Sequence, residues 1–190
     1  MDYIGEYREP FRWASDDLYH PDMKDYVEGN YSADNQLSDK DQNESRLWKY
    51  YEGIRKASTF IQNVDRCSEL TMDEIADMKG QARFLRAYCY WALIRVYGPV
   101  PLIPLEGLDV NLSYEELSLP REHFDNLVDF IDQELAESAR SLPTKRTVNN
   151  LGRPTRGAAL GLRSRVLLYA ASPLFNGNTD FFNVCLLYTS

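Results

Sequence analysis

The sequence has few of the residues that hold metals or form covalent cross-links. It contains three cysteines and two histidines among 190 residues, and they are widely spaced. Cys67, Cys89 and Cys185 form no CxxC pair, and His20 and His123 lie in no HxxxH or HExxH pattern. Because Cys89 falls on an apolar helical stripe, we expect the cysteines to be small buried hydrophobes. The sequence predicts no metal site and no other cofactor.

Positive charge and long apolar runs are also scarce. Lysine and arginine number 21 against 29 aspartates and glutamates, giving a net charge of -8. Nucleic-acid and anionic-membrane binding need clustered cations to neutralise phosphates, so this balance argues against both. The opening residues MDYIGE lack the basic start and apolar core of a signal peptide. The longest uncharged part of the principal helix runs from Ala87 to Ile94, far short of the ~20 residues that cross a bilayer.

Catalytic motifs are missing as well. The serines have no GxSxG context, and no glycine-rich phosphate loop occurs. Two pairs of adjacent acids, Asp16–Asp17 and Glu115–Glu116, raise the alternative of a glycoside hydrolase, which holds two carboxyl groups across a sugar. Adjacent acids in polar loops usually point in different directions and are solvated. We therefore expect a protein that is not an enzyme.

What the sequence does have is aromatic residues and helical periodicity. It contains 13 Tyr, 8 Phe and 3 Trp. The clearest helix begins at a capping box formed by Thr71 and Glu74 and ends at Gly98, which Pro99 follows. Two apolar stripes run along it: Ile75, Met78, Ala82, Leu85, Cys89, Ala92 and Val96 on one side, and Phe84, Tyr88, Trp91 and Arg95 on the other. A helix with two apolar faces is expected to lie between neighbours.

Three further helices are predicted around it. The first begins near residue 44, with Asp41 and Glu44 as a candidate cap, and carries the stripe Leu47, Tyr51, Ile54, Ser58 and Ile61. Another runs from about residue 121 to just before Pro143, with Phe124, Leu127, Val128, Ile131, Leu135 and Ala139 on one face. Thr155 caps the last helix, which extends through Ala171.

Small residues and turn residues add two local expectations. Gly157, Ala158 and Gly161 are small enough to let the last helix approach its partner closely. The polar stretch 144–154 is a turn, with a short hairpin around 149–152 as one possibility.

Together these patterns predict an all-α fold of tetratricopeptide-like antiparallel helix pairs with irregular, aromatic-rich loops. The expected organisation is an aromatic loop region at 1–43, a first helix pair at 44–97, a proline-rich excursion at 98–120, a second helix pair at 121–172, the start of a truncated region at 173–183 and a non-native tail at 184–190.

Several motifs in this framework resemble the SusD/RagB family. They are 48–57 (WKYYEGIRKA), 82–88 (ARFLRAY), 97–102 (YGPVPL), 120–121 (PR), 129–131 (DFI), 152–159 (GRPTRGAA) and 168–176 (LYAASPLFN). Each block is modest by itself, whereas the ordered set is specific. The resemblance spans roughly residues 48–176.

The resemblance implies a nutrient-binding protein without a catalytic centre. Members of the family are lipoproteins on the outer face of the Bacteroidetes outer membrane. They bind oligosaccharides or other nutrients and deliver them to a SusC-like TonB-dependent transporter. The signal peptide, the lipidated cysteine and the irregular C-terminal half of the family do not occur in this sequence, so we expect an internal fragment. The alternative function is a tetratricopeptide-type scaffold that binds a peptide or protein.

The candidate ligand residues lie before the first helix. Sugar recognition needs flat aromatic faces together with amide, carboxylate or guanidinium groups. This segment supplies both kinds: Arg12, Trp13, Asp16, Tyr19, Tyr26, Asn30 and Tyr31. The alternative for each aromatic is packing of the loops against the helices.

For the aromatic and arginine residues of the principal helix we expect structural roles rather than ligand contact. Phe84, Tyr88, Trp91 and Tyr97 occur near helical spacing, which favours core packing over ligand contact. Arg83 and Arg86 are expected to pair with acids or to cap carbonyl groups rather than to bind an anion.

Overall fold

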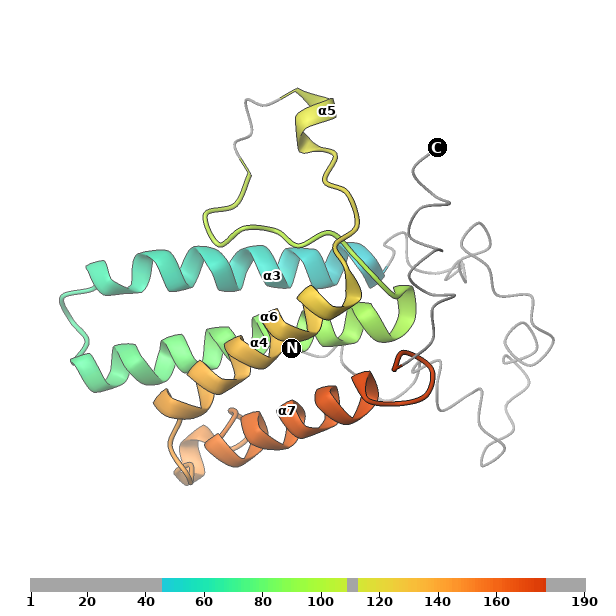
Figure 1. Cartoon of the computed structure of the whole chain (residues 1–190). Helices are drawn as coiled ribbons and strands as arrows, with labels where there is room; N and C mark the ends of the chain where they lie inside the picture. Colours follow the sequence, from blue (N-terminus) through green and yellow to red (C-terminus); the bar gives the residue numbers. More distant parts are fainter. Residues whose placement is uncertain (1–45, 109–112, 177–190) are drawn as a thin grey trace, which may run out of the picture. The chain divides into compact units, whose positions relative to one another are not determined.

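The computed structural model describes residues 46–108 and 113–176 (Figure 1). The chain divides into two units, Met1–Arg46 and Leu47–Ser190. The described residues belong almost entirely to the second, which is the helical unit discussed below.

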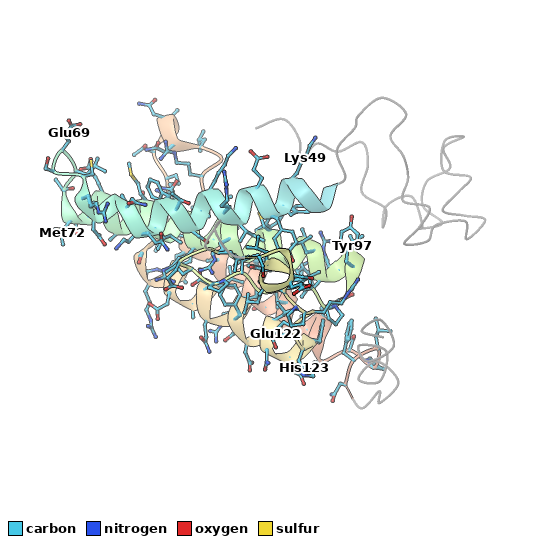
Figure 2. The ribbon with its side chains drawn as sticks, turned by 90° about the horizontal axis from the view of Figure 1, so that it is seen from above. Lys49, Glu69, Met72, Tyr97, Glu122 and His123 are labelled. Carbon is cyan, nitrogen blue, oxygen red and sulfur yellow. The ribbon has the colours of Figure 1, made fainter. Side chains whose placement is uncertain are left out.

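The described part of this unit is built from helices and turns, without a strand. Its elements are α3 (Arg46–Asn63), η2 (Val64–Arg66), α4 (Met72–Tyr97), α5 (Tyr114–Leu117), α6 (Phe124–Ser141), η3 (Val148–Asn150) and α7 (Arg156–Ala170). The long helices alternate in direction along the chain (Figure 1). In Figure 2, Glu69 and Met72 lie at one end of the bundle, while Lys49, Tyr97 and His123 lie toward the other. The all-α, helix-pair prediction is confirmed.

Local signals set the ends of α4 as predicted. Thr71 Oγ1 accepts a hydrogen bond from the Glu74 backbone N–H at 3.3 Å, and the Thr71 N–H donates to Glu74 Oε2 at 2.9 Å. This reciprocal pair satisfies two backbone donors that the first turn leaves unpaired. At the other end Gly98 takes φ 64°, a left-handed conformation that glycine adopts without steric cost.

The burial pattern of α4 differs from the two predicted stripes. Leu85, on the first stripe, is 37% exposed, whereas Arg86, on neither stripe, is 3% exposed. All five residues from Tyr90 to Ile94 are buried. The reason is that α4 packs against α3, α6 and α7, so the turn from Tyr90 to Ile94 is buried all around the helix and shows no periodicity.

One core cluster joins the four long helices. Its fully buried members include Ile54 from α3, Leu93 from α4, Ile131 from α6 and Val166 from α7. The apolar stripe predicted for 121–142 faces this core, with Leu127, Val128, Ile131, Leu135 and Ala139 all buried. The proposed Asp41–Glu44 cap lies outside the described residues, so this cap stays a prediction.

Close helix approach occurs at glycines other than those expected. A Cβ on Gly80 would lie 3.0 Å from Ser141 Cβ, and one on Gly53 would lie 3.1 Å from Cys89 Sγ. By contrast, a Cβ on Gly161 would meet nothing within 4 Å, and Ala158 is exposed. The prediction that Gly157, Ala158 and Gly161 face the helix partner is therefore wrong. The buried face of α7 is centred on Ala159 and Val166, on the opposite side.

Two smaller expectations are resolved by the connecting segments. Residues 144–154 form no hairpin, because 148–150 close into the single 3-10 turn η3 and Gly152 takes φ 89°. Cys67 and Cys89 are free thiols of intermediate burial, while Cys185 lies outside the described residues. Burial raises the pKa of the Cys89 thiol to about 11, as expected of a cysteine that packs as a hydrophobe.

Candidate functional site

The predicted ligand residues all lie outside the part of the chain that the structure describes. They are Arg12, Trp13, Asp16, Tyr19, Tyr26, Asn30 and Tyr31, all within the first unit. Their role therefore stays a prediction. What the structure adds is the geometry of the helical unit that follows them, including the aromatic and charged side chains that also look functional in the sequence.

Four aromatic rings form a connected group where α4 and α7 end and α6 begins; we call it the aromatic end. Trp91 meets Tyr169 edge to face at 5.1 Å between ring centroids, and Tyr169 meets Phe175 at 5.0 Å. Phe124 stacks on Phe175 with centroids 4.0 Å apart. The Arg95 guanidinium lies over Trp91, 5.3 Å from its centroid. Sugar binding needs a free ring face, whereas Trp91 is 3% exposed and its ring is covered by its neighbours.

The expectation of core packing holds for Phe84, Trp91 and Tyr97. Trp91 is buried, and Phe84 and Tyr97 pack partly buried against the core cluster. Phe84 also stacks on Tyr88 with ring centroids 6.5 Å apart. These side chains support the scaffold.

Side chains from α3 and α4 hold the irregular backbone that follows Gly98. The Tyr51 hydroxyl donates to the Pro101 carbonyl at 2.8 Å, and Gln62 Nε2 donates to the Leu105 carbonyl at 2.6 Å. The Tyr90 hydroxyl accepts from the Ile103 N–H at 2.9 Å, and Arg86 Nη2 donates to the Ile103 carbonyl at 3.2 Å. This segment has no helix or strand ladder of its own, so side chains satisfy its polar groups.

The residues just before α6 fasten the same segment from its other side. Arg121 Nη1 donates to the carbonyls of Tyr97 and Pro99 at 3.0 and 2.8 Å. The Glu122 N–H donates to the Val100 carbonyl at 3.1 Å. Residues 97–105 are thereby held from α3, α4 and the start of α6, and we call them the anchored segment.

Burial shifts the pKa values of the two tyrosines that hold this segment. Desolvation is the largest cause in both cases. The pKa of Tyr90 rises to about 12, and the pKa of Tyr51 rises further still. Both phenols therefore stay protonated across the physiological range and act as hydrogen-bonding groups rather than as general bases.

A buried carboxylate joins two arginines between α4 and α6. Arg83 Nη1 lies 2.5 Å from Glu134 Oε1, and Arg86 Nη1 lies 3.8 Å from Glu134 Oε2. The Arg86 guanidinium also lies over the Phe130 ring, 4.9 Å from its centroid. Burial raises the pKa of Glu134, although both arginines act in the opposite direction. These contacts confirm the expectation that Arg83 and Arg86 pair with an acid and that Arg86 caps a carbonyl group.

The sequence contains a signal that the Glu134 side chain is buried. Glu134 lies three residues after Ile131 and seven after Leu127, on the apolar stripe of the predicted helix. A charged residue on such a stripe needs a buried partner. Which residue provides it could not be found from α6 alone, because Arg83 is 51 positions away.

The described residues contain no cluster of side chains that could hold a metal ion. Among residues 46–108 and 113–176, no group of three or more histidines, cysteines or acids is placed to hold a metal ion. Glu115 lies in the short helix α5 rather than in the expected loop and is exposed, and Asp16–Asp17 lie outside those ranges. No described helix is both long enough and apolar enough for a membrane span.

Comparison with known proteins places this geometry in a family. The model of a SusD-like family, described as starch-binding and associating with the outer membrane, matches residues 14–168. A SusD-like protein of Bacteroides ovatus is 29% identical over 147 residues, which cover 76% of this chain and 26% of that protein. The chain spans about a quarter to a third of the length of the curated relatives it matches.

Solved structures agree with the family match. A SusD-like protein from Bacteroides fragilis superposes with a TM-score of 0.58 at 31% identity, covering 65% of this chain and 23% of that one. A surface glycan-binding protein from Bacteroides uniformis gives a TM-score of 0.57 at 25% identity, covering 75% of this chain and 30% of that one. The chain therefore belongs to the SusD-like family.

Proposed function

We propose that the protein to which this chain belongs binds an oligosaccharide or another nutrient at the cell surface. The observation that carries the proposal is the family match over residues 14–168, whose description is a starch-binding, outer-membrane-associated protein. The neighbour from Bacteroides uniformis, which is itself a surface glycan-binding protein, supports it. The ligand is bound and released unchanged, so no catalytic centre is required.

The proposed binding residues are those of the segment before α3. Five of the seven candidates, Asp16, Tyr19, Tyr26, Asn30 and Tyr31, fall inside the family match, and Arg12 and Trp13 directly precede it. Aromatic rings would stack on the C–H faces of the sugar, while the carboxylate, amide and guanidinium would meet hydroxyl groups. The described helices offer no comparable free surface at the aromatic end, since those rings cover one another.

Transfer of the ligand completes the proposal. The bound nutrient passes to a SusC-like TonB-dependent transporter, and a lipid anchor in the full-length protein holds the complex on the extracellular face of the outer membrane. Both steps follow from the resemblance to the SusD/RagB family. Co-purification of the full-length protein with such a transporter from outer membranes is the direct measurement.

Substitution of Trp13 tests the binding segment. In the full-length protein, Trp13→Ala should weaken glycan binding about tenfold or more, because a stacking contact of about 1.4 kcal/mol corresponds to that factor. A glycan array or affinity gel first identifies the polysaccharide, and calorimetry then measures the affinity. The melting temperature should stay unchanged.

Phe60→Ala is the matched control, since Phe60 is a partly exposed ring on the scaffold helix α3. It should leave glycan affinity unchanged. Unaltered affinity in Trp13→Ala would remove Trp13 from the site. Tight binding of a peptide, together with binding to no polysaccharide, would support the tetratricopeptide-type scaffold instead.

A further inference from the structure

Three buried polar atoms, one from each of α3, α4 and α6, have no hydrogen-bond partner among the described residues. They are Ser58 Oγ on α3, Arg86 Nε on α4 and Glu134 Oε2 on α6. The three residues are only 4%, 3% and 7% exposed, so bulk water does not reach these atoms. Burying a polar atom without a hydrogen bond is costly, and each of the three therefore needs a partner.

The side chain of Ser58 faces the anchored segment. Residues 101–105 of that segment run along α3 (Figure 1), where the Tyr51 hydroxyl donates to the Pro101 carbonyl. Farther along α3, Gln62 Nε2 donates to the Leu105 carbonyl. Tyr51, Ser58 and Gln62 are separated by steps of seven and four, which keep them on one face of the helix. Ser58 therefore lies between the two hydrogen bonds and faces the middle of residues 101–105.

Arg86 reaches the same stretch from α4, and Glu134 meets Arg86 from α6. Arg86 Nη2 donates to the Ile103 carbonyl at 3.2 Å, while the Phe130 ring lies against the guanidinium, 4.9 Å from centroid to Cζ. Arg86 Nη1 lies 3.8 Å from Glu134 Oε2. That separation is too long for a direct hydrogen bond, and a bridging water suits it. The three unpaired atoms thus belong to side chains that meet beneath the anchored segment.

The chemistry of the three atoms selects water over an ion. Glu134 Oε2 can only accept while ionised, Arg86 Nε can only donate, and the Ser58 hydroxyl can do either. An anion would suit the guanidinium but would be repelled by the carboxylate. A metal cation would suit the carboxylate but would be repelled by Arg83 and Arg86, which both lie beside it. Water both donates and accepts and carries no charge, so it can satisfy all three atoms.

We propose that ordered water binds between α3, α4 and α6 beneath the anchored segment and bridges Ser58 Oγ, Arg86 Nε and Glu134 Oε2. A buried water typically makes about three hydrogen bonds to polar groups that lack other partners, which is the number available here. The water acts as a structural ligand. It links the three helices and, through Arg86, connects them to the Ile103 carbonyl.

A crystal structure of the full-length protein, at a resolution that shows ordered water, tests the site directly. The expected result is a water molecule within about 2.6–3.2 Å of both Arg86 Nε and Glu134 Oε2, with Ser58 Oγ bonded to it or to a second water. Direct pairing of these atoms with protein groups would overturn the proposal. So would an ion in place of water, or no density between the side chains.

Ser58→Ala in the full-length protein tests the same site in solution by the sign of its effect. If the hydroxyl is bonded to bound water, its removal breaks a buried hydrogen bond, and the melting temperature should fall by about 1–3 °C. If the hydroxyl has no partner, its removal relieves a buried unpaired group, and the melting temperature should stay the same or rise. Either of those results would overturn the proposal.

Thr59→Ala is the matched control, because Thr59 is the next residue of α3 and is exposed. This variant also removes a hydroxyl group from the helix, and its melting temperature should stay the same or rise slightly. An equal fall in both variants would show a general effect of substitution in α3 and would remove the support from Ser58→Ala. Neither measurement depends on whether the protein binds a glycan.

Discussion

At the scale of single residues, buried polar side chains do most to fix the irregular backbone. The anchored segment 97–105 makes no regular ladder, so hydroxyl and guanidinium groups provide its hydrogen bonds. Tyr90 is the clearest case, because it is fully buried and its ring also meets Phe130 edge to face at 5.2 Å. Burial of a phenol is favourable only when its hydroxyl finds a partner.

Tyr90→Phe should therefore destabilise the helical unit. The substitution keeps the ring but removes the acceptor of the Ile103 N–H, which then lies unpaired beside the core. Leaving such a group unsatisfied costs about 1–3 kcal/mol. Denaturant unfolding followed by circular dichroism measures the change.

Tyr169→Phe is the control for that experiment. Tyr169 is also an aromatic residue packed against the core, but its contacts are ring contacts with Trp91 and Phe175. The free energy of unfolding of the Tyr169→Phe variant should differ from that of the unaltered chain by less than about 0.5 kcal/mol. Equal losses in the two variants would contradict the role assigned to the Tyr90 hydroxyl.

At the scale of helices, the close contact between α4 and α6 depends on Gly80. Ser138 Oγ, which is buried on α6, donates to the Gly80 carbonyl at 2.7 Å. A side chain at position 80 would hold the two helices apart, since the nearest atoms belong to Ser141 and to the buried Leu142. The glycine is thus retained in a helix where it is intrinsically unfavourable.

Gly80→Ala should destabilise the unit by about 1–3 kcal/mol, because overpacking at a fixed helix contact outweighs the gain in helix propensity. Gly161→Ala in the same chain should instead stabilise it by up to about 1 kcal/mol, since its Cβ meets nothing within 4 Å. Thermal unfolding of both variants gives the comparison. A gain in stability at position 80 would show that α6 yields to the added methyl.

At the scale of the whole chain, the apolar surface left open on α7 governs solution behaviour. Leu160, Leu167 and Leu168 are exposed together on one helix, and an apolar surface of this kind favours association. This chain by itself is accordingly expected to aggregate readily or to be marginally stable. The side of α7 that carries these three leucines is the surface on which that association should begin.

The double variant Leu160→Gln, Leu168→Gln should weaken binding of an apolar fluorescent dye to this chain and raise the concentration at which it aggregates. Helicity by circular dichroism should not change, because neither side chain belongs to the core. Met72→Gln is the control, since Met72 is 80% exposed but lies at the start of α4. An equal effect of Met72→Gln would indicate general solubilisation rather than a role for α7.

The sequence by itself determined the four long helices, both ends of α4, the start of α7 and the family. Capping at Thr71 and Thr155 and the stop at Gly98 depend on residues within one turn, so periodicity and local chemistry were sufficient to predict them. The ordered motifs likewise lie in the letters and predicted the SusD-like family that the family model confirms. The ligand segment at 1–43 was also proposed from the sequence alone, and it stays a prediction.

Only the tertiary structure decided which faces of those helices are covered. On α4, Arg86 is buried and Leu85 is exposed, and Glu134 is buried on α6. Gly80 and Gly53 lie at the close contacts between helices, whereas a Cβ on Gly161 would meet nothing within 4 Å. Each outcome depends on residues from another helix, such as Glu134 for Arg83 across 51 positions. Periodicity gives the angle of a side chain around its own helix axis, but burial also depends on where the neighbouring helices stand, which no local pattern contains.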